Sequence, residues 1–120
     1  MTNNKYIKGM TGQDEAEAYL INKGCQVLYR NYRLRSGEID LIVQDGTYIV
    51  FVEVKYRQSV ELGFPREAVT RSKQHKIIKT ALHFIAETNR PNQDYRFDVV
   101  EVLGMPEKFE VTHIINAFTC

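Results

Sequence analysis

Two carboxylates and a lysine interrupt segments that otherwise have the apolar composition of strands. Asp40 lies in GEIDLI (37–42), and Glu53 and Lys55 lie in FVEVKYR (51–57). Charged side chains of these types are rarely fully buried unless they are paired or bind a metal. Carboxylate oxygens suit Mg²⁺ or Mn²⁺, and a lysine beside them can stabilise charge that develops on a phosphate. The pattern therefore favours a divalent metal site that acts on phosphodiesters.

A hairpin would bring the two acids together. Asp45 and Gly46 lie between the two apolar segments, and Asp-Gly in that place is a strong signal for a two-residue turn. If these residues form the turn, Asp40 pairs with Phe51. Asp40 and Glu53 then share one face of the hairpin as diagonal neighbours, with Cβ atoms about 7 Å apart. We expect the core on the opposite face, at Ile39, Leu41, Val43, Val50, Val52 and Val54.

An ion-paired strand is the alternative explanation for these charges. Glu53 could pair with Lys55 or Arg57 on a solvated face, and exposed pairs of this kind contribute only about 0–1 kcal/mol. In the metal interpretation, the carbonyl of Val54 is a plausible additional ligand, and Arg57 is a candidate phosphate contact outside the site.

The rest of the chain supplies the elements that would hold this hairpin. Alternating apolar residues predict strands at residues 26–33, 38–43, 47–57, 95–103 and 109–115. Helices are predicted from Thr11 to Gly24 and from Thr70 or Ser72 to about Thr88. The second helix is expected to bury Ile77, Ile78, Ala81, Leu82 and Ile85. This order predicts an α/β fold with a mixed central sheet flanked by helices.

Four further residues have structural interpretations. We expect Arg96 or Asp98 to form a structural pairing with the central sheet, His83 to be exposed, and His113 to lie at a strand edge.

Length and composition indicate one globular domain. The chain has 120 residues, enough for one core but not for two, so we assign residues 1–120 to a single domain. With 43% hydrophobic and 26% charged residues, neither a disordered nor a membrane protein is indicated. The first residues lack the apolar core of a signal peptide, and the two cysteines form no disulfide framework. We expect a cytoplasmic protein.

Basic charge is concentrated after the carboxylate motif. Residues 55–90 contain eight Lys or Arg and three acidic residues, whereas residues 91–120 contain two Lys or Arg and five acidic residues. This asymmetry suits a polyanion that crosses from the metal site onto the second helix. Lys73, His75 and Lys76, at the start of that helix, are candidate nucleic-acid contacts. A helix with a solvated lysine-rich face is the alternative.

The motifs closely resemble those of the YraN-like family of small bacterial proteins. The resemblance rests on GEIDLI (37–42), VFVEVK (50–55), TRSKQHK (70–76) and RFDVV (96–100), and extends from about residue 12 to residue 102. This family is similar to the PD-(D/E)xK nuclease superfamily, especially archaeal Holliday junction resolvases. The resemblance implies a restriction-endonuclease-like αβββαβ core, Asp40 and Glu53 as metal-binding acids, and Lys55 as the catalytic lysine. Because such resolvases act as dimers, it also suggests a homodimer.

One position departs from the superfamily pattern. Many of these nucleases carry a further Glu on the first helix, where this chain has Gln13, although Asp14 or Glu17 could substitute. The first hypothesis is therefore a Mg²⁺- or Mn²⁺-dependent endonuclease acting on structured or branched DNA. The second is a non-catalytic or partner-dependent nucleic-acid-binding module on the same fold. A protein-interaction adaptor with a relic acidic cluster is the third.

Overall fold

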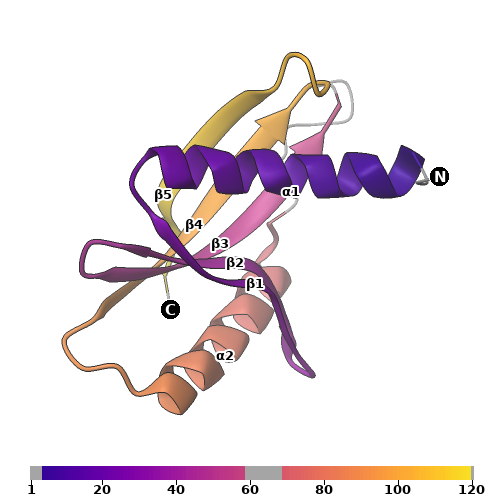
Figure 1. Ribbon diagram of the computed structural model, residues 1–120. Coiled ribbons are helices and arrows are strands. Elements are labelled where there is room, and N and C mark those ends of the chain that lie inside the picture. Colours follow the sequence, from indigo (N-terminus) through magenta and orange to yellow (C-terminus); the bar gives the residue numbers. More distant parts are fainter. Residues whose placement is uncertain (1–3, 59–68, 120) are drawn as a thin grey trace.

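A computed structural model describes residues 4–58 and 69–119, with the side chains of residues 4–11 left out (Figure 1). Two helices and five strands follow one another as α1 (Asn4–Asn22), β1 (Gln26–Leu34), β2 (Gly37–Asp45), β3 (Tyr48–Arg57), α2 (Arg71–Thr88), β4 (Asp94–Leu103) and β5 (Glu110–Phe118). The predicted α-β-β-β-α-β order is confirmed, and the strand predicted near the C-terminus is β5. The first helix begins at Asn4 rather than at Thr11.

The five strands form one mixed sheet in the order β1-β2-β3-β4-β5. Only β3 and β4 run parallel, and α2 makes the crossover between them, as a parallel connection requires. The other neighbouring strands pair antiparallel. Helices α1 and α2 lie on opposite sides of the sheet (Figure 1). The architecture is an α/β sandwich compatible with a restriction-endonuclease-like core.

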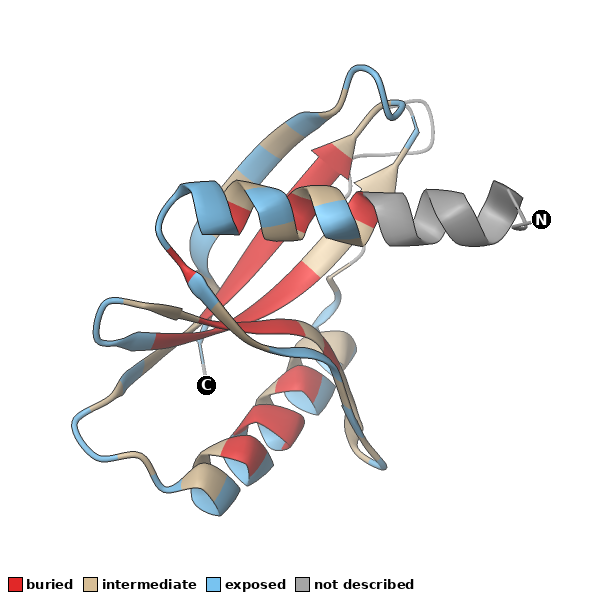
Figure 2. Cartoon of the chain, viewed as in Figure 1, coloured by how far each residue is buried: buried red, intermediate tan, exposed pale blue. Residues whose placement is uncertain are grey.

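Both faces of the sheet are packed (Figure 2), whereas we expected the core on one face. Leu41, Val43, Val50 and Val52 do form a core beneath α1, together with Ala16 and Leu20. A second core beneath α2 contains Ile39, Ile42, Ile49, Phe51, Phe97 and Val99. Sheets that carry a helix on each face bury both faces of their central strands, so the acids do not lie on an open solvated surface.

Helix α2 begins as predicted but buries a different stripe. Thr70 is its N-cap and accepts a hydrogen bond from the Lys73 backbone N–H. The buried side chains are Ile77, Thr80, Ala81 and Phe84, which follow the i, i+3, i+4, i+7 spacing of one helical face. Leu82, which we expected in the core, is 53% exposed.

The turn between β2 and β3 is displaced from its predicted position. Asp45 pairs with Tyr48, so Gly46 and Thr47 are the central residues, and Gly46 has a φ of 61° that favours glycine. Phe51 consequently pairs with Ile42 rather than with Asp40. The displacement amounts to two residues on β3, which leaves Asp40 and Glu53 on the same face. Ile39, which we expected on the same face as Leu41, packs instead in the core beneath α2.

A buried polar cluster connects β4 to β5 beneath α1. The carboxylate of Asp98 accepts hydrogen bonds from Arg96 Nε at 3.1 and 3.2 Å and from the Asn116 N–H at 2.9 Å, and its Oδ2 lies 2.7 Å from His113 Nε2. Arg96 also donates to Asp45 at 2.9 Å. The predicted structural pair is confirmed. His113 lies on the edge strand β5, as expected, and its side chain is buried within the cluster. His83 is exposed, as expected.

Within the described residues, no helix is long and apolar enough to cross a membrane.

Candidate functional site

The candidate site lies where β2 and β3 separate. Their pairing runs from the turn to Leu41 and Val52 and stops there. Beyond this point β2 continues with β1, and β3 continues with β4. The same register carried one residue further would set Asp40 opposite Glu53. The side chains at the fork line a cavity of about 310 Å³, namely Gly37, Glu38, Asp40, Glu53, Val54, Lys55, Lys73, Lys76 and Ile77.

Asp40 takes the place of a strand carbonyl at the fork. Its Oδ2 accepts a hydrogen bond from the Val54 backbone N–H at 2.8 Å. This bond satisfies an amide that the separated strands would otherwise leave without a partner. The bond also holds the Asp40 carboxylate beside the first residues of β3 that do not pair with β2. The position of this carboxylate relative to Glu53 is thereby fixed.

The two acids are close neighbours in a largely desolvated place. Burial, the charge of Glu53 and a side-chain hydrogen bond with Glu53 raise the pKa of Asp40 from 3.8 to about 7, although the Val54 N–H opposes this rise. Glu53 itself is only 6% exposed. Adjacent buried carboxylates repel each other when both are ionised, and a cation between them would relieve that repulsion.

Two lysines supply positive charge to the same cavity. Lys55 Nζ and Lys73 Nζ each lie 3.6 Å from Glu53 Oε1. Lys55 comes from β3 and its side chain is 12% exposed, whereas Lys73 reaches in from the first turn of α2. Burial and the adjacent Lys73 amine lower the pKa of Lys55. The site therefore combines two acids with two amines, one of which comes from the helix.

The structure brings together most, but not all, of the predicted site residues. Asp40, Glu53, Val54, Lys55, Lys73 and Lys76 line the one cavity. His75 lies on the other side of α2, where it lines a separate cavity with Arg71 and Phe118. Arg57 is at the end of β3 and is not among the described residues that line the carboxylate cavity.

The first helix adds no acid to the described site. Gln13 follows Gly12, whose Cα faces the Tyr56 ring closely enough that an added Cβ would lie 3.1 Å from that ring. Glu17 is bound to Arg30, which donates to it at 2.7 Å through Nε. In the part of the chain that the structure describes, no group of three or more His, Cys, Asp or Glu side chains is arranged to hold a metal.

The role of Lys73 inside the cavity was not foreseen from the sequence. We predicted it as a phosphate contact on the surface of the helix. One sequence feature could have indicated this role, namely the position of Lys73 three residues after the Thr70 N-cap. A side chain in the first turn of a crossover helix can point back toward the strand that precedes the helix. The sequence does not show how close that turn lies to Glu53.

Fold and cavity together define an α/β protein with a carboxylate and lysine site at a strand fork. Comparison with known proteins then gives the family. Residues 12–102 match the model of the uncharacterised protein family UPF0102. A UPF0102 protein of Lachnoclostridium phytofermentans is 47% identical over 116 residues, covering 96% of this chain and 95% of the relative. A UPF0102 protein of Clostridioides difficile is 44% identical over 116 residues, covering 97% and 99%. The chain belongs to the UPF0102 family, which confirms the YraN-like resemblance.

Proposed function

We propose that this protein is a divalent-metal-dependent endonuclease that hydrolyses phosphodiester bonds in structured or branched DNA. The observation that supports this function best is the convergence of Asp40, Glu53 and Lys55 in one cavity at the fork. A buried acid, a half-buried acid and a half-buried amine on one strand pair have no packing role that apolar residues would not serve better.

The acids fit a hard divalent cation. They offer oxygen ligands side by side, and Mg²⁺ is commonly held by one or two carboxylates, with waters and substrate phosphate completing its shell. The pair of acids described here is therefore a sufficient protein contribution. Asp40 and Glu53 would hold the ion, with the Val54 carbonyl as a further ligand. When bound, the ion would supply Lewis-acid activation of water and neutralise charge on the phosphate.

Lys55 and Lys73 would bind the substrate phosphate rather than the metal. Lys55 lies against Glu53 and within the same cavity, where it would hold the phosphate and stabilise negative charge that develops during hydrolysis. Lys73 would anchor the same phosphate from the helix side, because its amine reaches the same carboxylate.

A nucleic-acid-binding module without catalysis is the second candidate, and two observations favour it. Gln13 is neutral where many superfamily nucleases have an acid, and Glu17 is occupied by Arg30. Glu53 is also charge-compensated by two lysines at 3.6 Å. An ion-paired carboxylate holds a cation less readily than a free one, so the site could retain phosphate binding while lacking a bound metal.

A cleavage and binding experiment separates the two candidates. Labelled four-way junction, duplex and single-stranded DNA would be incubated with the protein in Mg²⁺, in Mn²⁺ and in EDTA. Glu53→Gln and Lys55→Ala would be compared with the exposed controls Glu107→Gln and Lys108→Ala, which remove the same charges outside the cavity. Binding would be recorded on the same samples.

The endonuclease predicts metal-dependent cleavage that both site variants lose and both controls keep. Salt-dependent binding by wild type with no cleavage in either metal would establish the binding module instead. If the protein neither binds nor cleaves any of the three DNAs, both candidates fail.

A further inference from the structure

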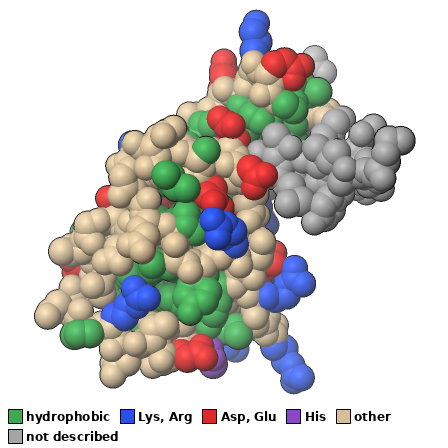
Figure 3. All heavy atoms as spheres, viewed as in Figure 1, with side chains coloured by type: hydrophobic (Ala, Val, Ile, Leu, Met, Phe, Trp, Pro, Cys, Tyr) green, Lys and Arg blue, Asp and Glu red, His purple; other side chains and the backbone are tan. Residues whose placement is uncertain are grey.

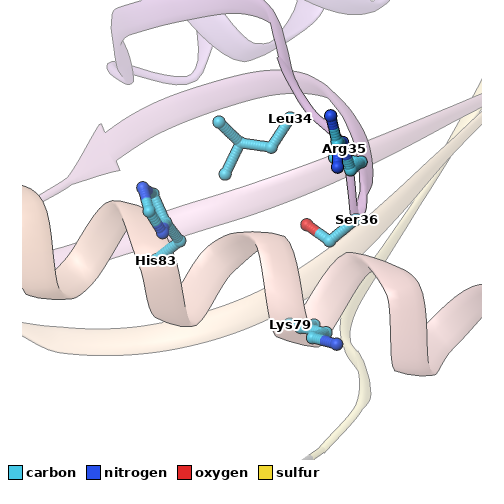
Figure 4. Close-up of a pocket in the computed structure, with 5 residues that line it drawn as sticks. All are labelled: Leu34, Arg35, Ser36, Lys79 and His83. Atoms are coloured by element: carbon cyan, nitrogen blue, oxygen red, sulfur yellow. The ribbon is translucent and has the colours of Figure 1, made fainter.

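A second open cavity adjoins the carboxylate site along α2. It has a volume of about 500 Å³ and lies between the β1–β2 turn and the helix. Leu34, Arg35 and Ser36 line it from the turn, and Lys79 and His83 line it from the helix (Figure 4). Ser36 directly precedes Gly37, and Lys79 lies one helical turn after Lys76; Gly37 and Lys76 both line the carboxylate cavity. The two cavities therefore follow one another along the same groove.

The turn is fixed against the helix at this point. Thr80 Oγ1 donates to the Lys76 carbonyl at 2.9 Å, so the Ser36 hydroxyl, 2.7 Å away, is the donor to Thr80. At Gly37 a Cβ would lie 3.2 Å from Thr80 Oγ1 and 3.3 Å from the Lys76 carbonyl. The close approach that glycine allows and the hydroxyl pair hold the β1–β2 turn at a set distance from the helix, so the groove is preformed.

Three cationic side chains along the groove, those of Arg35, Lys76 and Lys79, are available to contact a ligand. Lys76, Lys79 and His83 are spaced i, i+3 and i+7, which places them along one face of α2. Arg35, Lys76 and Lys79 are exposed, and none of them forms an ion pair with another described residue. His83 differs, because its ring lies 3.8 Å from Glu87.

This local arrangement matters because the surface seen in Figure 3 has no continuous basic patch. In the view of Figure 3, Lys and Arg side chains are scattered among apolar and acidic ones rather than gathered in a continuous patch. Net charge is only +1. Unpaired cations that line a groove leading to the candidate site therefore offer a more specific location for a polyanion than the general surface does.

We infer that the groove formed by Arg35, Ser36, Lys76 and Lys79 binds the sugar–phosphate backbone of one DNA strand next to the phosphate held at the carboxylate cavity. The inference rests on the proposed nucleic-acid function. Lys73 and His83 are ten positions apart, or about 15 Å along the helix, which is long enough to follow a few successive phosphates of one strand. Since the contacts are to phosphates, the groove fixes the position of the strand without reading its sequence.

The test is DNA binding by the double variant Arg35→Gln/Lys79→Gln as a function of salt. A fluorescent junction and a duplex would be titrated without divalent metal at several salt concentrations. The control is Lys23→Gln/Lys108→Gln, which removes two exposed lysines that line none of the described cavities. Circular dichroism and thermal unfolding would show that all variants are folded.

The expected loss follows from counterion release. Each phosphate contact adds about 0.9 to the slope of log affinity against log salt, which is worth about 8-fold in affinity at 0.1 M relative to 1 M salt. The groove variant should therefore bind about 60-fold more weakly at 0.1 M salt, with a slope smaller by about two, while the control variant stays within about twofold of wild type.

Other results would overturn the inference in distinguishable ways. If the groove variant binds like wild type while Glu53→Gln and Lys55→Ala abolish cleavage, the groove is wrong and the proposed function stands. An equal loss in the groove and control variants would show general charge attraction instead of a groove. If wild type binds no DNA, or binds anionic vesicles in its place, the groove and the proposed function fail together.

Discussion

Asp40→Asn should make the metal-free protein more stable at alkaline pH, although it removes a residue of the candidate site. Burial beside Glu53 raises the pKa of Asp40 to about 7, whereas the unfolded chain has an ordinary value. Between pH 4 and 7 the folded protein therefore holds a proton that the unfolded chain releases. Wild-type stability falls as pH rises through this window, and the neutral amide of the variant removes that dependence.

The magnitude follows from the two pKa values. At about 1.4 kcal/mol per pH unit, the difference between 3.8 and about 7 corresponds to about 4 kcal/mol. Asp40 is not fully buried, so solvent screening reduces the expected gain to about 2–4 kcal/mol at pH 8. An Asn side-chain oxygen can still accept from the Val54 N–H, so the fork itself should survive the substitution.

The measurement is urea unfolding of both proteins at pH 4.5, 6 and 8 in EDTA, followed by circular dichroism. The difference in free energy of unfolding should be small at pH 4.5 and grow to its full value at pH 8. Glu107→Gln, an exposed acid, corrects for the loss of one surface charge. Addition of Mg²⁺ at pH 8 should then stabilise wild type and leave Asp40→Asn unchanged. If the difference in free energy of unfolding between the two proteins stays constant from pH 4.5 to 8, the raised pKa of Asp40 is refuted.

Four further substitutions test the structure around the site. Asp98→Ala should destabilise by about 3–5 kcal/mol in urea unfolding, because it leaves a buried ion-pair partner without its charge; a loss below about 1 kcal/mol would contradict the cluster. Gly12→Ala should lower the melting temperature although alanine favours helices, because its methyl group would lie 3.1 Å from the Tyr56 ring; a rise would show that the ring yields. Phe84→Ala should lose about 3–5 kcal/mol and Leu82→Ala less than about 1 kcal/mol, and equal losses would contradict the observed burial of α2.

Sequence periodicity predicted the elements well, since each strand and helix has its own local pattern. The order of elements, the Thr70 cap and the location of the hairpin are all local properties. The register was less accessible, because Asp45-Gly46 and Gly46-Thr47 both place glycine in a two-residue turn. The error of two residues left Asp40 and Glu53 correctly assigned to the same side, although the end of the β2–β3 pairing just before these two acids was not foreseen.

Features that depend on packing between distant segments could not be predicted. The buried stripe of α2 is rotated from Leu82 toward Phe84, because Tyr29, Tyr32 and Phe51 surround the Phe84 ring. The entry of Lys73 into the cavity depends on how the helix crosses the sheet, and the burial of His113 depends on Asp98 in a neighbouring strand. In each case the partner is remote in sequence, so periodicity carries no information about the contact.

The hydrogen bond between Val54 and Asp40 makes one backbone amide a spectroscopic reporter for the site. Most strand amides bind carbonyls and sense only folding, whereas this amide binds a side chain whose charge can change. Its nitrogen and proton NMR resonances should therefore move when Asp40 ionises or when a cation draws on the carboxylate. Occupancy could be followed on the protein alone, before any substrate is known. The same two resonances would distinguish a site that binds a metal from a site in which Lys55 and Lys73 already neutralise Glu53.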